Sequence, residues 1–298
     1  MKNQLKQGLI KKQTLTDAEV AEVEQLAHVC NTYENLGMRI GWIKLRSPHN
    51  SITNDFLYYE DGALVGYLVV DNRGTKKKEL TGMVHPDHRR KGIFTTLFTA
   101  AREECSQRGV SRLILICEHH SRSGQALIAA LGAKHRFSEH EMILETLQAR
   151  YTFDDRLSFR AAEEDDLDAL VKIMMSEPDE TLEELQAFVI QCFQETNCQF
   201  YIGMLGEGGV GCKEPVGCLR VYERPDVIGI YGFVVRPEYR GRGYGRQILE
   251  ETIRDIQASS HKSIMLEVDT ENSNALGLYR SCGFKESRTY GYYAFDLA

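Results

Sequence analysis

The sequence predicts an α/β fold made of two tandem copies of one domain, each with a mixed central sheet flanked by helices. Three observations predict this fold. The chain has 298 residues, a usual length for two domains. Strand and helix patterns alternate along it. A turn motif of the first half also recurs in the second half at a fixed separation.

The repeat is the strongest of these observations. Residues 84–92 have the sequence VHPDHRRKG, and residues 235–243 have the sequence VRPEYRGRG. Their prolines are 151 residues apart, and the same separation aligns residues 83–133 with residues 234–284 without a gap. A chance match would copy one motif, whereas this register is kept across a predicted strand, helix, strand and helix. The two halves are therefore expected to share one fold.

The first half begins with a predicted helix. Thr16 and Glu19 have the spacing of a capping box, and an apolar helical stripe follows them. Asp61-Gly62 is typical of a hairpin turn between two strands. The elements expected after the first helix are strands at 56–59 and 64–70, a helix at 93–108, a strand at 112–117 and a helix at 123–131.

The second half repeats this order. Its first helix is expected to start in the acidic stretch 163–166, because carboxylates stabilise the positive end of the helix dipole. The elements expected after it are strands at 198–204, 215–221, 227–235 and 263–268, helices at 244–258 and 273–282, and a final hairpin to 296. We therefore expect an N-terminal domain over 1–148 and a C-terminal domain over 157–298, joined by the polar stretch 146–156.

Composition argues against several classes of protein. The net charge of −7 argues against a nucleic-acid or anionic-membrane partner. No window approaches 18 apolar residues, and the polar N-terminus has no long apolar run, so neither a membrane helix nor a signal peptide is expected. The eight cysteines form no CxxC pair and several lie in apolar runs, which is typical of buried, reduced thiols in a cytoplasmic protein. We expect a monomer or a homodimer.

A glycine-rich loop is a candidate phosphate site. It follows the apolar strand Ile230–Val235 and opens a helix, and it consists of Arg240, Gly241, Arg242, Gly243, Tyr244 and Gly245. Glycines let a ligand approach the backbone, N–H groups at a helix start suit a pyrophosphate, and the arginines add positive charge. The alternatives are a turn with solvated arginines and the loop of a dinucleotide-binding fold, whose glycine spacing differs.

A second segment supports the first. Residues 266–284 have the sequence LEVDTENSNALGLYRSCGF. Together the two segments resemble the GNAT (GCN5-related N-acetyltransferase) superfamily. The glycine-rich loop resembles the R/Q-x-x-G-x-G/A pattern of this superfamily, and residues 266–284 resemble its N-x-x-A-x-x-L-Y-x-x-x-G-F pattern. The matching residues of the second pattern are Asn272, Ala275, Leu278, Tyr279, Gly283 and Phe284. The resemblance covers most of 157–298 and, in a weaker form, 40–145, and the tandem arrangement is similar to two-domain members such as mycothiol synthase.

The resemblance implies a function. The chain would transfer an acetyl group from acetyl-CoA, its co-substrate, to a primary amine of a small molecule or peptide. Acetyl-CoA would lie where the strands 227–235 and 263–268 splay apart. Backbone groups of Phe233, Val234 and Val235 would hold the pantetheine arm and the thioester carbonyl, because a fixed N–H donor stabilises the negative charge that develops there.

Three polar side chains are the candidates for the remaining roles. Tyr279 would protonate the leaving thiolate, and Asn272 would hydrogen-bond the CoA arm. Glu267 lies where a glutamate serves as base in GNATs that resemble the ribosomal-protein N-terminal acetyltransferases. Each has a structural alternative: a core tyrosine, a helix-start asparagine and a strand-end carboxylate, respectively. Glu223, Asp226 or water are the other candidates for the base.

The N-terminal copy lacks most of these residues. Its loop keeps Arg89 and Gly92. The replacements at the 151-residue separation are Phe94 for Gly245, Ile116 for Glu267, Ser121 for Asn272 and Ile128 for Tyr279. We therefore expect catalysis in the C-terminal domain and a scaffold in the N-terminal domain, although Arg89, Arg90 and Lys91 leave phosphate binding there open.

Other features leave alternatives. A CoA-binding sensor without turnover and a transferase of a longer acyl group use the same motifs. Residues 176–184, SEPDETLEE, would either attract a cationic amine or start a helix. Glu118-His119-His120 has no third ligand at a suitable spacing, so no metal is expected. Lys76-Lys77-Lys78 is expected to be a solvated turn.

Overall fold

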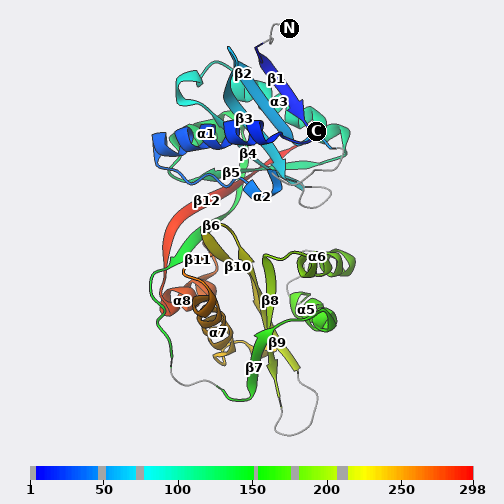
Figure 1. Cartoon of the computed structure of the whole chain (residues 1–298), viewed down its shortest axis with the longest axis vertical. Helices are drawn as coiled ribbons and strands as arrows, with labels where there is room; N and C mark the ends of the chain where they lie inside the picture. The colour runs from blue at the N-terminus through cyan, green and yellow to red at the C-terminus, as the bar shows by residue number, and fades with distance from the viewer. Residues whose placement is uncertain are drawn as a thin grey trace. The chain divides into compact units, whose positions relative to one another are not determined.

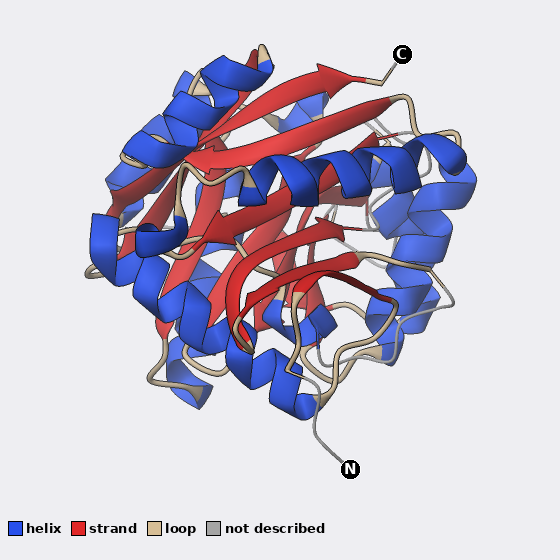
Figure 2. Cartoon of the chain, turned by 90° about the horizontal axis from the view of Figure 1, so that it is seen from above, coloured by secondary structure: helices blue, strands red, loops and turns tan. Residues whose placement is uncertain are grey.

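The computed structural model describes residues 5–45, 52–71, 77–150, 154–175, 181–206 and 214–297. The chain forms two compact units. Unit 1 consists of Met1–Glu139 and Arg288–Ala298, and unit 2 consists of His140–Ser287. In each unit helices cover the strands, as the ribbon and its colouring by secondary structure show (Figure 1, Figure 2).

Unit 1 has the strand order β1-β2-β3-β4-β5-β12, in which β4 and β5 are parallel and the other neighbours are antiparallel. Its strands are β1 (Gly8–Lys12), β2 (Asp55–Glu60), β3 (Ala63–Asp71), β4 (Lys77–Val84), β5 (Arg112–Glu118) and the end of β12 (Phe284–Asp296). Its helices are α1 (Asp17–Glu34), α2 (Trp42–Leu45), η1 (Pro86–His88), α3 (Ile93–Gln107) and α4 (Arg122–Leu131).

Unit 2 contains the antiparallel strands β7-β8-β9-β10 and the parallel pair β10-β11. Its strands are β7 (Leu157–Ala161), β8 (Cys198–Leu205), β9 (Glu214–Glu223), β10 (Val227–Val235) and β11 (Ser263–Asp269), with the end of β6 (Lys134–Leu144) and the start of β12. Its helices are η2 (Glu164–Asp166), α5 (Leu167–Met174), α6 (Leu182–Gln194), η3 (Pro237–Tyr239), α7 (Tyr244–Ser259) and α8 (Ser273–Cys282).

The apolar residues of each unit form two clusters. In unit 2, one cluster joins α7 and α8 to the strands through residues such as Ile248 and Leu266, and the other joins α5 and α6 to them through Leu170 and Phe200. Figure 1 shows α7 and α8 on one side of these strands and α5 and α6 on the other. Unit 1 likewise has one cluster under α3 and α4 and one under α1. The strands of each unit are therefore covered on both faces, as alternating strands and helices predict.

Most predicted elements agree with the structure. The capping box at Thr16 is confirmed, and the elements predicted in 93–131 and 244–282 match to within one residue at each end. Strands β1, β6 and β7 and helix α2 were not predicted, and the start of α6 was expected as one of the alternatives for residues 176–184. The turn expected at Lys76-Lys77-Lys78 is wrong for Lys77 and Lys78, which begin β4, and Lys78 has only 8% of its surface exposed. Lys76 lies outside the described residues. Burial lowers the pKa of the Lys78 ammonium group.

The end of the chain differs from the prediction. The final hairpin is wrong, because residues 284–296 form the single strand β12. Gly291 lies inside this strand, and its missing side chain leaves room for the Tyr293 ring instead of making a turn. From Tyr290 to Asp296, β12 pairs with β5, so the C-terminus belongs to unit 1, whereas the domain 157–298 was expected to keep it. Residues 140–148, expected in the first domain, belong to unit 2.

No helix of the described residues is long and apolar enough to cross a membrane.

Candidate functional site

Two parallel strands diverge in unit 2. The ladder between β10 and β11 runs from Val227–Ser263 to Ile230–Leu266, but both strands continue beyond it, to Val235 and Asp269. The half-buried Glu267 is the first residue of β11 past the last pair. Main-chain groups beyond that pair are no longer bonded between the two strands. In unit 1 the ladder of β4 and β5 ends in the same way, at Leu80–Leu115.

A β-bulge interrupts β10 at this point. Tyr231 pairs with Arg220 and Val234 pairs with Cys218, so Gly232 and Phe233 face one residue of β9. Gly232 is exposed and has a φ of +55°, a conformation that favours glycine. The described part of β4 pairs with β3 without any such shift, from Val84 to Glu79. The bulge therefore distinguishes the two units. It was not predicted from the sequence, although a glycine inside an apolar strand, such as Gly232, is a signal for a bulge.

The bulge brings Phe233 close to Tyr279. Phe233 and Val235 pack against the cluster of α7 and α8, and Val234 packs against that of α5 and α6. The ring centroids of Phe233 and Tyr279 are 6.4 Å apart. Tyr279 is 7% exposed and also contacts Phe284. Tyr279 is therefore part of the core and at the same time adjacent to the bulge.

The glycine-rich loop has the backbone that its sequence predicts. Gly241 and Gly243 have φ angles of +75° and +87°, and a Cβ atom on either would meet open space. A Cβ atom on Gly245 would lie 3.3 Å from Cγ2 of Val235, so a larger residue would crowd this strand. No side chain of the described residues caps the start of α7. An exposed helix start next to unobstructed glycines has the form of a phosphate site.

The arginines of the loop have different surroundings. Nε of Arg240 donates to the carbonyl oxygen of Val235 at 2.8 Å, so Arg240 also holds the loop to the end of β10. Arg242 is exposed and lies 5.8 Å from the ring centre of Tyr239. In unit 1, Nε of Arg89 makes the same bond to Val84, at 3.1 Å. This arginine–carbonyl contact is common to both units and is a structural feature.

Two other candidate residues have local structural roles. Oδ1 of Asn272 accepts the N–H of Ala275 at 3.1 Å, which confirms the helix-start alternative for its oxygen. The hydroxyl of Tyr244 donates to Asp154 at 3.1 Å. Burial, followed by the Asp154 carboxylate, raises the pKa of Tyr244. These contacts hold the starts of α8 and α7 in place.

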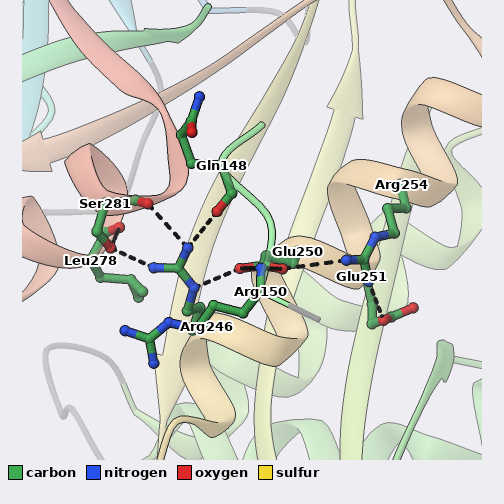
Figure 3. Close-up of polar contacts among 8 residues, drawn as sticks. All are labelled: Gln148, Arg150, Arg246, Glu250, Glu251, Arg254, Leu278 and Ser281. Atoms are coloured by element: carbon green, nitrogen blue, oxygen red, sulfur yellow. Dashed lines mark hydrogen bonds and ion pairs between the residues drawn. The ribbon is translucent and has the colours of Figure 1, made fainter. Parts of the chain in front are cut away.

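A buried ion pair supports the helix that carries Tyr279. Nε of Arg246 lies 2.6 Å from a carboxylate oxygen of the fully buried Glu250, which also accepts the N–H of Arg150 at 2.9 Å (Figure 3). The other guanidinium nitrogens donate to the hydroxyl and carbonyl of Ser281 and to the carbonyl of Gln148. This network ties α7 to the last turn of α8. The network was not predicted from the sequence, although Arg246 and Glu250 have the i,i+4 spacing of a helical ion pair.

In unit 1 a carboxylate lies where the parallel strands β4 and β5 diverge. Glu34, the last residue of α1, accepts a bond from Arg89 at 2.8 Å and bonds from Ser121 and Ser123 at 3.1 Å each. Arg89 follows β4, and the two serines begin α4, after β5. The side chain of Glu34 is only 13% exposed. It therefore bridges the two ends of the diverging strands, where the family resemblance puts the CoA arm.

The other replacements in unit 1 are apolar. Ile128, which corresponds to Tyr279, is 6% exposed in the cluster under α3 and α4. Phe94 corresponds to Gly245, and a Cβ atom on Gly82 would lie 3.0 Å from its ring. Phe94 thus packs at Gly82 of β4, whereas Gly245 places no side chain against β10.

The remaining predicted features are peripheral. Residues 176–180 of the acidic stretch lie outside the described residues. Thr181 and Glu184 form a capping box at the start of α6, which confirms the helix-start alternative for them. Within the part of the chain that the structure describes, no group of three histidine, cysteine or acidic residues is arranged to hold a metal ion.

Comparison with known proteins identifies the family. A model of the Acetyltransferase (GNAT) family matches residues 20–133 and 159–284. The chain is 34% identical to the ribosomal protein bS18-alanine N-acetyltransferase of Salmonella typhimurium over 21% of the chain and 42% of that protein, and 34% identical to N-alpha-acetyltransferase 30 of Saccharomyces cerevisiae over 26% of the chain and 48% of that protein. The matched stretches thus span less than half of these relatives.

Solved structures show the same fold over the whole chain. A GCN5-related N-acetyltransferase from Sphaerobacter thermophilus has a TM-score of 0.80 at 18% identity and covers 99% of this chain and 97% of that one. A tandem GNAT protein from the clavulanic acid biosynthesis pathway has a TM-score of 0.76 at 16% identity, with coverages of 97% and 98%. With the family model matching both halves, the chain belongs to the GNAT acetyltransferase family and contains two GNAT domains.

Proposed function

We propose that this chain transfers an acetyl group from acetyl-CoA to the primary amine of a small molecule or peptide, and that unit 2 carries the reaction. The observation that carries this proposal is the bulge at Gly232 and Phe233, which lies where β10 and β11 diverge. A bulge leaves main-chain groups outside the ladder, where a ligand can use them. The relatives named for N-terminal acetylation support an amine as acceptor.

The donor would be held mainly by the backbone. The pyrophosphate would bind the N–H groups at the start of α7, after Gly241 and Gly243, with Arg242 adding positive charge. The pantetheine arm would lie along Phe233–Val235 in the manner of an added strand. Acetyl-CoA supplies an activated thioester, and an exposed N–H of the bulge would stabilise the negative charge that develops on its carbonyl oxygen.

Two side chains would move protons. Tyr279, packed against Phe233, would protonate the leaving thiolate. Its position depends on α8, which the Arg246–Glu250 network fixes. Glu267, at the point of divergence, would take the proton of the amine directly or through water. Unit 1 has an isoleucine at both positions, Ile128 and Ile116.

The test uses the full chain. Calorimetric titration with acetyl-CoA is expected to show one binding site per chain, and release of free thiol is then followed with a panel of primary amines. A folded chain that does not bind acetyl-CoA would contradict the proposal. Binding without thiol release for any amine would favour the alternative of a CoA-binding sensor. Faster release from butyryl- or octanoyl-CoA would favour a transferase of longer acyl groups.

A further inference from the structure

An aromatic and cationic cluster lies beside the bulge of unit 2. Arg220 is the cross-strand partner of Tyr231, the residue directly before Gly232. Its guanidinium carbon lies 5.2 Å from the ring centres of both Tyr231 and Phe188 and 5.7 Å from that of Tyr222. These distances allow cation–π contact, so the three rings fix the guanidinium plane.

Arg224 approaches the same ring. Its guanidinium carbon lies 5.7 Å from the ring centre of Tyr231, and its Nη2 donates to the Tyr231 hydroxyl. Gly229 leaves room for this ring, because a Cβ atom there would lie 2.3 Å from it. Two guanidinium groups therefore flank one tyrosine whose position is set by the backbone of its own strand.

Neither guanidinium is paired with a carboxylate within the described residues. The polar contact of the Arg220 guanidinium is Sγ of Cys198, at 3.9 Å, and that of Arg224 is the Tyr231 hydroxyl. Glu223 is the neighbouring carboxylate in sequence, but it is bound to Lys262 at 2.6 Å. Two nearby like charges repel each other, so an anion placed between them would be bound favourably. This arrangement is notable in a chain whose net charge is −7.

The cluster lies on the face from which an acceptor would approach. Phe188 belongs to α6, so the cluster is on the α5 and α6 face of the strands, whereas Tyr279 and the start of α7 are on the other face. A nucleophile attacks a carbonyl from outside its plane. If the donor arm and its proton donor are on the α7 and α8 face, the amine must enter from the α5 and α6 face.

We propose that Arg220 and Arg224 form a subsite for a carboxylate of the acceptor, which is then an amine that also carries a carboxylate. The inference rests on the proposed function, because it assigns the acceptor of that same site. A planar guanidinium fork matches a carboxylate in two parallel hydrogen bonds, and Arg220 is held in one plane by its rings. The acidic stretch 176–184 led to the opposite expectation, a cationic amine as acceptor. An acceptor that carries a carboxylate and an acceptor that carries extra positive charge can therefore be distinguished by experiment.

The kinetic test compares acceptors that differ only in the carboxylate. Glycine, β-alanine and 4-aminobutyrate are each paired with their amides, and kcat/KM is measured for every compound. The acid of at least one pair is expected to exceed its amide by about tenfold or more. Arg220→Ala should remove this preference by raising KM for the acid, whereas the Kd of acetyl-CoA should stay unchanged. Arg220→Lys should restore only part of it, because lysine keeps the charge but not the fork.

A second test measures binding and does not depend on turnover. Calorimetry with glutarate and with glutaramide, in the wild type and in Arg220→Ala, probes the subsite even if no amine is acetylated. Arg102→Ala is the control, because Arg102 is exposed on α3 of unit 1. Stronger binding of glutarate that is lost in Arg220→Ala alone supports the inference. Equal binding of both compounds, or a preference for amides or dicationic amines, overturns it.

Discussion

The two units share one order of elements but differ where their parallel strands diverge. In unit 2 the strand carries a bulge at Gly232, the loop is open, and Tyr279 packs next to the bulge. In unit 1 the strand is uninterrupted, and Glu34 bridges the two strand ends through Arg89, Ser121 and Ser123. The comparison teaches that this fold does not need its reactive features in order to be stable, since unit 1 forms without them.

Removal of the bulge should have the largest effect. Deletion of Gly232 would give β10 the uninterrupted pairing that β4 has, without removing a side chain. We expect kcat to fall by about 10²–10³-fold, the usual cost of losing one donor to a developing oxyanion. Circular dichroism and urea unfolding should still report a folded chain. A rate within tenfold of the wild type would exclude the bulge from the mechanism.

Substitution of the proton donor should come next. Tyr279→Phe should lower kcat by about tenfold or more and leave the Kd of acetyl-CoA unchanged, because it removes only a hydroxyl. The matched change in unit 1, Ile128→Ala, should leave kcat unchanged and lower the free energy of unfolding by about 2 to 5 kcal/mol through a core cavity. An unchanged kcat for Tyr279→Phe at saturating substrates would assign the tyrosine to packing alone.

The glycine loops allow a matched pair of substitutions. Gly92 and Gly243 have nearly the same φ, +81° and +87°, so valine at either should cost about 1 to 2 kcal/mol of stability in strain. Only Gly243→Val should weaken acetyl-CoA binding, by about tenfold, because only unit 2 is expected to bind it. If both variants weakened binding equally in calorimetry, unit 1 would also be a CoA site.

Substitution of Glu34 in unit 1 should have a smaller effect than these changes. Glu34→Gln keeps the size of the side chain but weakens its bonds to Arg89 and the two serines. We expect a loss of about 1 to 3 kcal/mol in the free energy of unfolding. The number of acetyl-CoA molecules bound should stay at one per chain, because the apolar replacements remain. A second molecule bound by the variant would instead mean that Glu34 alone blocks unit 1.

Cysteine reactivity is expected to show the smallest difference between the two units. The thiol of Cys192 and then the guanidinium of Arg220 lower the pKa of Cys198, whereas burial raises the pKa of Cys30 and Cys105 in unit 1. At neutral pH a larger fraction of Cys198 is therefore thiolate, and iodoacetamide should label it before the cysteines of unit 1. Labelling should slow in Arg220→Ala. Peptide mapping that finds a unit 1 cysteine labelled first would contradict these environments.

The structure also shows where the chain cannot be cut to obtain an isolated second domain. A fragment that starts in the expected linker, such as 151–298, does not correspond to unit 2. Unit 2 starts at His140 and includes the fully buried Met142, and the N–H of Arg150 binds Glu250. The last strand of that fragment pairs with β5 of unit 1. Binding experiments therefore need the full chain, because the fragment would lose core contacts and expose a strand edge.

Sequence patterns predicted the elements that depend on local interactions. The capping box at Thr16 and the helix from 244 follow from side chains three or four residues apart. The glycines of the loop follow from φ angles that other residues avoid. The repeat, the family and the loss of Tyr279 in the first copy were likewise visible in the residues themselves.

Tertiary structure alone decided which strands pair and which side chains meet. Nothing near residue 290 indicates that β12 pairs with β5, because strand partners are chosen by hydrogen bonds between distant segments. The bulge depends on the register of β9 against β10, and the contacts of Glu34 join residues that are 55 and 87 positions apart. The sequence by itself determined two GNAT domains and their candidate residues. Long-range pairing decided where the strands diverge, which divergence a carboxylate bridges, and which one carries a bulge beside Arg220.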